Sequence, residues 1–97
     1  MRVVFHPRVL SDLSSIMDYY ERVATRELAD DFYAEFRAAV KAIAAKPESV
    51  SLRKGDIRRV NLRRFPYHFL FRIAGEAMRV LVVRHHYRRP SFATRRK

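Results

Sequence analysis

The chain has 97 residues, with 21 Lys and Arg against 10 Asp and Glu, and 48% of its residues are hydrophobic, which predicts one folded domain over residues 1–97 rather than a disordered chain. It contains no cysteine, and its four histidines lack the spacing of a zinc motif, so we expect no disulfide, no metal site and no cofactor. No apolar run approaches the roughly 20 residues that span a bilayer, and residues 1–7 are too short for a signal peptide, so we expect a cytoplasmic protein that contacts no membrane.

The first half of the chain has the pattern of a strand followed by two helices. Residues 2–6 form a short β-prone run that ends at Pro7, a residue suited to the first turn of a helix. Apolar residues then recur every three or four positions, which predicts an amphipathic helix over residues 7–22. Thr25 is the predicted N-cap of a second helix, which should end before Lys46-Pro47 because the residue before proline is disfavoured in a helix.

The second half changes to the two-residue period of strands. Residues 47–56 predict a loop, and strands are expected over residues 58–64, 67–74 and 78–85, the last two joined by a turn at Gly75-Glu76. Strands joined by short turns pair antiparallel. In the middle strand, Tyr67 and Phe69 point to one side while His68 points to the other.

The order of these elements is β-α-α-β-β-β. It predicts an α+β fold in which an N-terminal αα-hairpin packs on one face of a small, mainly antiparallel sheet. The arginines of the second half are then expected on the exposed face of the sheet and its rim.

The positive charge is concentrated in the second half of the chain. Residues 53–97 carry a net charge of +12, with Asp56 and Glu76 as their only acidic residues, whereas residues 1–52 carry −1. A surface of mixed charge is usually only solvated, but an unbalanced run rich in arginine favours binding, because the guanidinium group matches phosphate and carboxylate. We therefore predict a polyanion or an acidic partner for this half.

Three segments of the sequence carry a resemblance to a known family. They are Asp12-Leu13 with Ile16 and Tyr20; Arg58-Arg59 followed by the run from Phe65-Pro66-Tyr67 to Arg72; and residues 80–83 leading into His85-His86-Tyr87-Arg88-Arg89-Pro90, closed by Arg95-Arg96. Over nearly the whole chain, they resemble the RelE/ParE superfamily of bacterial toxins from type II toxin-antitoxin modules. The resemblance implies a growth-inhibiting toxin neutralised by a cognate antitoxin, whose segment covers the basic face and the helices.

The resemblance leaves two activities open, because the members of the family divide between them. One branch inhibits DNA gyrase through a protein interface, and the Phe65-Pro66-Tyr67 turn and the basic tail favour this branch. The other branch cleaves messenger RNA in the ribosome without a metal, which would make this protein an endoribonuclease. A basic nucleic-acid-binding module without toxicity is a third alternative. The sequence does not fix the oligomeric state.

Each of these activities has candidate residues. For a ribonuclease, Arg84, His85 and Tyr87 could contact the phosphate, transfer protons and stack on a base at the end of the last strand. His85 and His86 are adjacent, so a continuing strand would point them to opposite sides. The residues expected to bind phosphate or a partner are Arg53, Lys54, Arg58, Arg59, Arg88 and Arg89.

Overall fold

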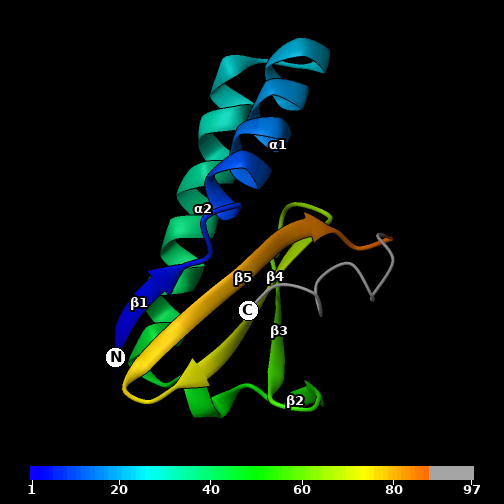
Figure 1. Ribbon diagram of the computed structural model, residues 1–97. Coiled ribbons are helices and arrows are strands. Elements are labelled where there is room, and N and C mark those ends of the chain that lie inside the picture. The colour runs from blue at the N-terminus through cyan, green and yellow to red at the C-terminus, as the bar shows by residue number, and fades with distance from the viewer. Residues whose placement is uncertain (88–97) are drawn as a thin grey trace.

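A computed structural model describes residues 1–87 of the chain (Figure 1). Its elements are β1 (Arg2–Phe5), α1 (Val9–Val23), α2 (Arg26–Ala45), the 3-10 helix η1 (Pro47–Ser49), β2 (Leu52–Lys54), β3 (Ile57–Asn61), β4 (Tyr67–Ala74) and β5 (Ala77–His85). The predicted α+β fold and its order of elements are confirmed, with one additional strand, β2. The basic tail expected after Tyr87 lies outside the described residues.

The two helices form where their apolar stripes and caps predict them. In α1, Val9, Leu13 and Ile16 are buried, which confirms the predicted apolar side. Thr25 has an extended backbone, and its hydroxyl oxygen accepts the Leu28 N–H at 3.0 Å, so the predicted N-cap of α2 is confirmed. The helix ends at Ala45, as the following Lys46-Pro47 pair requires.

The five strands form a mixed sheet in the order β1-β5-β4-β3-β2. The pairs β3–β4 and β4–β5 are antiparallel, as expected for strands joined by short turns. In contrast, β1 pairs parallel with β5, from Arg2 opposite Ala77 to Phe5 opposite Val80. The chain from α1 to β4 lies between these two strands and supplies the long connection that a parallel pair needs.

The expectation of a loop over residues 47–56 was wrong, because this range contains η1 and β2. All three residues of β2 are exposed, so they lack the apolar alternation that marks a strand. The strand pairs with β3 across a turn in which Gly55 has a φ of 58°, a conformation suited to glycine. The next strand, β3, ends at Asn61 rather than residue 64, since the Leu62 N–H already bonds to the Tyr67 carbonyl at 2.9 Å.

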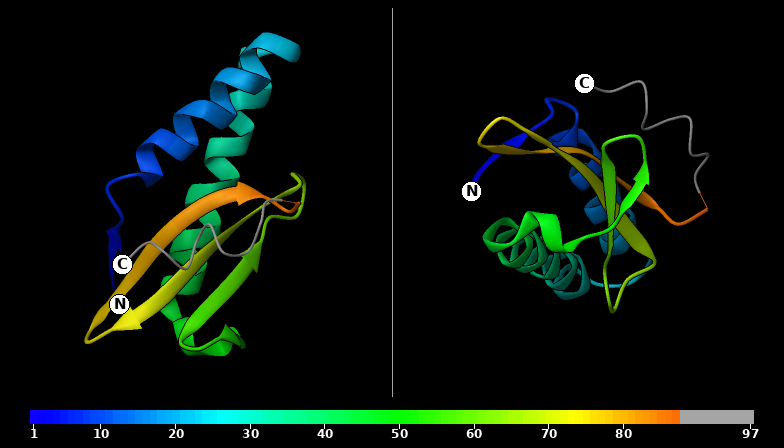
Figure 2. Two further views of the ribbon diagram at one scale, coloured as in Figure 1. Left: turned by 45° about the vertical axis from the view of Figure 1, so that its right-hand side comes forward. Right: turned by 90° about the horizontal axis from the view of Figure 1, so that it is seen from below.

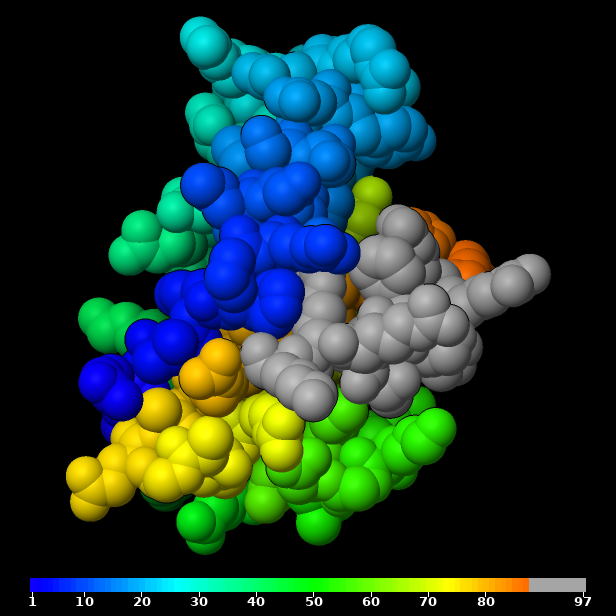
Figure 3. All heavy atoms as spheres, viewed as in Figure 1, coloured from blue at the N-terminus to red at the C-terminus, as the bar shows by residue number. Residues whose placement is uncertain are grey.

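The main core lies between the helical hairpin and one face of the sheet (Figure 2). Phe32 and Phe36 of α2 are buried against aromatic residues of the sheet, and the rings of Phe32 and Phe65 meet edge to face with centroids 5.5 Å apart. Phe65 and Tyr67 are buried on either side of Pro66, which confirms a structural role for this turn. Beyond this core, the free end of the hairpin extends past the sheet (Figure 3).

A carboxylate joins the first helix to the edge of the sheet. The pairing of β1 with β5 ends at Val80, so the edge of β5 beyond it faces α1 instead of a strand. There the Val83 N–H donates to the Asp12 carboxylate at 3.0 Å. Asp12 thus fixes α1 to the half of β5 that leads into the candidate site.

Candidate functional site

The sheet face opposite the helices carries the polar residues of the candidate site. Along β4, Tyr67 packs in the core beneath the helices, and its neighbour His68 points to the opposite face. Leu70, Leu81 and Val82 form a small apolar cluster that is separate from the main core. The candidate site lies beside this cluster, where β3, β4 and β5 contribute arginine and histidine side chains.

Two arginines meet at the β2–β3 edge of the sheet. Arg53 and Arg59 line a hollow of about 370 Å³ together with Asn61. The Arg59 Nε donates to the Asn61 Oδ1 at 2.8 Å, and burial, followed by the charge of Arg53, lowers the pKa of Arg59. Among residues 1–87, no carboxylate forms an ion pair with either guanidinium. The two like charges can therefore receive the oxygen atoms of an external anion.

A chain of hydrogen bonds runs beside this pair of arginines. The Arg84 Nε donates to the His68 Nε2 at 3.0 Å, and the Nδ1 atoms of His68 and His86 are 3.0 Å apart. The Arg59 Nη2 lies 3.3 Å from the same His86 Nδ1. The two imidazole rings are nearly parallel, with an angle of 7° between their planes. The chain fixes side chains from β3, β4 and β5 relative to one another.

The two hydrogen-bonded histidines, His68 and His86, are neutral at neutral pH. His68 is 1% exposed, and its burial, followed by the charges of Arg59 and Arg84, lowers its pKa to about 3. Burial and the charge of Arg59 also lower the pKa of His86. The sequence analysis did not select His68 as a site residue. Its only signal was the alternation that turns it away from Tyr67, and alternation cannot show that a polar residue is buried.

The three residues proposed for catalysis do not share one surface. The Arg84 side chain is 7% exposed and bonds to His68 on the face opposite the helices. The His85 ring instead meets the core residue Tyr67 edge to face, with centroids 5.3 Å apart. Tyr87 is 91% exposed and donates its N–H to the His85 Nδ1 at 3.3 Å. Adjacent strand positions thus place Arg84 and His85 on opposite faces of the sheet.

The residues proposed for phosphate or partner binding fall into three groups. Arg53 and Arg59 line the same hollow, and we call them the anion-binding pair after the role proposed for them below; Lys54 is exposed at the end of β2. Arg58, expected on the exposed face, points to the helix side, where it donates to the carbonyls of residues 48 and 50. Its neighbour Arg59 takes the opposite side because successive strand residues alternate. Arg88 and Arg89 lie outside the described residues.

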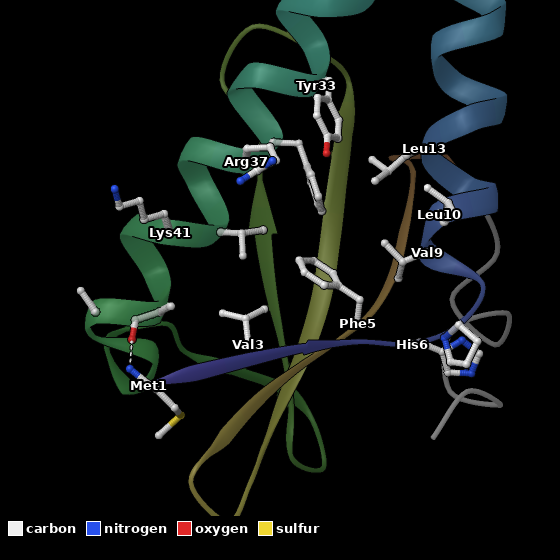
Figure 4. Close-up of a pocket in the computed structure, with 15 residues that line it drawn as sticks. Met1, Val3, Phe5, His6, Val9, Leu10, Leu13, Tyr33, Arg37 and Lys41 are labelled. Carbon is white, nitrogen blue, oxygen red and sulfur yellow. Dashed lines mark hydrogen bonds between the residues drawn. The ribbon is translucent and has the colours of Figure 1, made fainter.

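A second surface is an apolar groove of about 900 Å³ on the helix side (Figure 4). Val3 and Phe5 of β1 point into the groove. One wall contains Leu10 of α1, and the other contains Tyr33 and Arg37 of α2. Phe5 is 46% and Leu10 is 76% exposed, which is unusual for large apolar side chains gathered in one place. The outer edge of β1 borders the groove, because β5 pairs with its other edge only.

Within residues 1–87, no three histidine or acidic side chains gather in a way that could hold a metal ion. The same residues include no helix that is long and apolar enough to cross a bilayer. The basic site itself offers hydrogen-bond donors and positive charge, which suit anionic oxygen atoms.

Residues 3–90 match the model of a family described as the ParE toxin of the type II toxin-antitoxin system, parDE. The fold is similar to a chain from the chromosomal ParDE toxin-antitoxin system of P. aeruginosa, with a TM-score of 0.79 and 22% identity, covering 88% of this chain and 95% of that one. The intact E. coli RelBE toxin-antitoxin complex contains a chain with a TM-score of 0.61 and 16% identity, covering 90% and 98%.

The isolated E. coli RelE toxin is similar to the same extent. Its TM-score is 0.61 and its identity 15%, covering 97% of this chain and 93% of that one. No curated protein sequence matches the chain. At these identities, the likeness to the solved structures shows a shared fold.

Proposed function

The chain belongs to the ParE family of type II toxin-antitoxin toxins, and on this basis we propose that it arrests growth by inhibiting DNA gyrase and is neutralised by a cognate antitoxin. The family match over residues 3–90 is the observation that carries the proposal. The Phe65-Pro66-Tyr67 turn supports the same branch of the superfamily. Inhibition through an interface requires no catalytic residue, so the protein would act by binding.

The geometry at the end of β5 favours an interface over a nuclease centre. Cleavage of RNA at a 2′-hydroxyl needs a base, an acid and a cation around one phosphate. Arg84 is buried against His68, whereas His85 contacts Tyr67 on the other face of the sheet. These two residues therefore cannot surround one phosphate from their present positions.

The anion-binding pair is the part of the basic face that we propose meets the gyrase–DNA complex. Arg53 and Arg59 lie together without a carboxylate partner among residues 1–87, and Arg59 is partly desolvated. An acidic side chain or a DNA phosphate placed between them would relieve the repulsion of the two guanidinium groups. Binding at such a site weakens as salt concentration rises, because the charges become screened.

The apolar groove is the surface that we propose for the antitoxin. Its exposed apolar side chains, including Phe5 and Leu10, suit the apolar face of a helix or an extended segment. Arg37 and Lys41 on its α2 wall suit acidic residues beside that apolar face (Figure 4). The free edge of β1 could additionally pair with an extended segment.

Gyrase inhibition can be tested with the purified full chain in a DNA supercoiling assay. We expect the wild type to inhibit supercoiling and to trap broken DNA, and its induction to produce filamentous cells. A double variant, Arg53→Gln with Arg59→Gln, should inhibit at least about tenfold less well, because two charged hydrogen bonds are lost. The matched control is Arg8→Gln with Arg22→Gln, which removes the exposed arginines just before α1 and in its last turn. Unimpaired supercoiling at any toxin concentration would refute the proposal.

Ribosome-dependent cleavage of messenger RNA is the second candidate, and the pair Arg53 and Arg59 beside His86 is the observation that favours it. This mechanism predicts cuts at codon-spaced positions in translated messages soon after induction. A His85→Ala variant would test the predicted proton donor, since His85 is not part of the buried chain around His68. Intact messages in growth-arrested cells would exclude this second candidate.

A further inference from the structure

The positions of the protons in the histidine chain follow from its arginine donors. A guanidinium group can donate hydrogen bonds but cannot accept them, so the bond from Arg84 makes the His68 Nε2 an acceptor. A neutral His68 then carries its proton on Nδ1, which faces the His86 Nδ1 at 3.0 Å. His68 donates this proton, and His86 consequently carries its own proton on Nε2.

The contact between Arg59 and His86, at the other end of the hydrogen-bonded row, requires the same proton positions. The Arg59 Nη2 lies 3.3 Å from the His86 Nδ1, and it too can only donate. A proton on this Nδ1 would face the guanidinium of Arg59 and the ring of His68 without an acceptor. Such a donor without an acceptor is unfavourable in this half-buried position. Arg84 and Arg59, at opposite ends of the hydrogen-bonded row, therefore require the same proton positions: Nδ1–H on His68 and Nε2–H on His86.

The other two histidines of the protein, His6 and His85, carry their protons on the other ring nitrogen. His6 accepts the Arg8 N–H at its Nδ1 at 3.1 Å, and His85 accepts the Tyr87 N–H at its Nδ1. Both of these rings must carry the proton on Nε2 when neutral, as free histidine prefers. His68 is thus unusual among the four histidines, because its surroundings require the Nδ1–H form.

We propose that His68 is a positioning residue, which fixes His86 as a hydrogen-bond donor through Nε2–H and holds the Arg84 guanidinium beside it. His86, whose Nδ1 lies 3.3 Å from the Arg59 Nη2, then offers one uncharged donor near the anion-binding pair for an anionic oxygen of a phosphate or carboxylate. It does not serve as a base, because its Nδ1 accepts from His68 and Arg59 and its Nε2 is protonated. The proposal rests on the proposed function in taking this face of the sheet to meet the target.

The proton positions can be measured directly on the full-length wild type at neutral pH. Long-range ¹H–¹⁵N spectra distinguish the two neutral forms of each imidazole by the shifts of its nitrogens. We expect Nδ1–H for His68 and Nε2–H for His86, with His6 and His85 as internal references. A His68 ring protonated on Nε2 would overturn the proposal, whatever the cellular target.

Two isosteric substitutions separate the two functions of His68. The side-chain amide of His68→Asn can replace the Nδ1 donor to His86, whereas the amide oxygen of His68→Gln can replace the acceptor for Arg84. We expect His68→Asn to keep the Nε2–H form of His86, although it loses the acceptor for Arg84. His68→Gln should lose that form and require at least about tenfold more toxin than His68→Asn for the same arrest, the effect of one hydrogen bond to a charged group.

Growth arrest is the functional readout because it does not depend on which target the toxin binds. The matched controls are His85→Asn and His85→Gln, which alter the adjacent imidazole on the other face of the sheet, and both should behave alike. If the wild type does not inhibit gyrase but the two His68 variants differ as expected, the positioning role stands and the proposed target is wrong. Equal growth arrest and equal His86 spectra in the two His68 variants would refute the positioning role.

Discussion

At the scale of single residues, burial of a neutral histidine couples folding to pH. The pKa of His68 is lowered from 6.5 to about 3 by burial and then by the charges of Arg59 on β3, Arg84 on β5, His86 just after β5 and Arg53 on β2. Below pH 6.5 the unfolded chain takes up a proton at this residue and the folded chain does not. The free energy of unfolding therefore falls as the pH falls from 6.5 toward 3, and it is fully retained above this range.

This coupling predicts a change in the acid sensitivity of a variant. One proton contributes about 1.4 kcal/mol per pH unit, so His68 should account for roughly 2 kcal/mol of the stability lost between pH 7.5 and pH 5. In His68→Gln, the difference between the free energies of unfolding at these two pH values should shrink by about that amount. Urea denaturation at both pH values measures it, with His6→Gln as the control. A difference equal to that of the wild type would show that His68 does not titrate as described.

At this scale, the sequence predicts which residue types the strands carry but not which face of the sheet each side chain takes. The pattern of the second half correctly identified arginine-rich strands, but it could not distinguish Arg58, which points to the helix side, from Arg59, which points to the other. Alternation gives relative directions only, and its absolute sense depends on which face the helices cover. The pairing of His68 with Arg84 could not be predicted either, because it depends on the register between the adjacent strands β4 and β5.

At the scale of elements, a carboxylate fastens the second helix to the turn that precedes β4. Glu35 of α2 accepts the backbone N–H groups of Arg63 at 2.7 Å and of Arg64 at 3.3 Å. These N–H groups belong to the turn between β3 and β4, where no strand neighbour can bond to them. The contact therefore sets the position of the buried Phe65 relative to α2.

Removing this carboxylate should loosen the turn. We expect Glu35→Ala to lower the free energy of unfolding by roughly 0.5–1.5 kcal/mol, because two exposed backbone N–H groups exchange a charged acceptor for water. The amide protons of Arg63 and Arg64 should also exchange faster with solvent. Thermal unfolding and hydrogen exchange measure these effects, and Asp30→Ala on the exposed side of the same helix is the control. An unchanged melting temperature would mean that the turn is held by Phe65 packing instead.

Elements with a strong period could be predicted from the sequence, and those without one could not. The helices and the strands β4 and β5 begin and end within a few residues of their predicted bounds, because each buries a regular apolar stripe. In contrast, β2 consists of exposed residues and forms only because β3 offers it a free edge. The parallel pairing of β1 with β5 depends on the path of the whole chain from α1 to β4 between them, which no local pattern records.

At the scale of the whole molecule, the sheet separates two surfaces of different chemistry. The groove lies on the helix side, and the anion-binding pair with its histidine chain lies on the opposite face. An antitoxin segment bound in the groove would therefore leave Arg53 and Arg59 uncovered unless another part of the same antitoxin reaches around the sheet. Neutralisation and toxicity should consequently depend on different residues.

This separation predicts a variant that escapes its antitoxin and stays toxic. Leu10→Glu places a charge on an exposed apolar position in the groove, where it cannot disturb the core but repels an apolar and acidic segment. The apolar contact of one leucine is worth about 1.5–3 kcal/mol, so binding should weaken by roughly 10-fold to 100-fold.

Calorimetry with the product of the neighbouring gene would measure this affinity, and co-expression would measure neutralisation. Val23→Glu, at another exposed apolar position of α1 that lies outside the groove, should bind and be neutralised normally. Conversely, the double variant Arg53→Gln with Arg59→Gln should lose toxicity and keep its affinity for the groove-binding segment. If Leu10→Glu were neutralised as well as the wild type, the antitoxin would have to act through the basic face, since that is the other surface offering unsatisfied binding groups among residues 1–87.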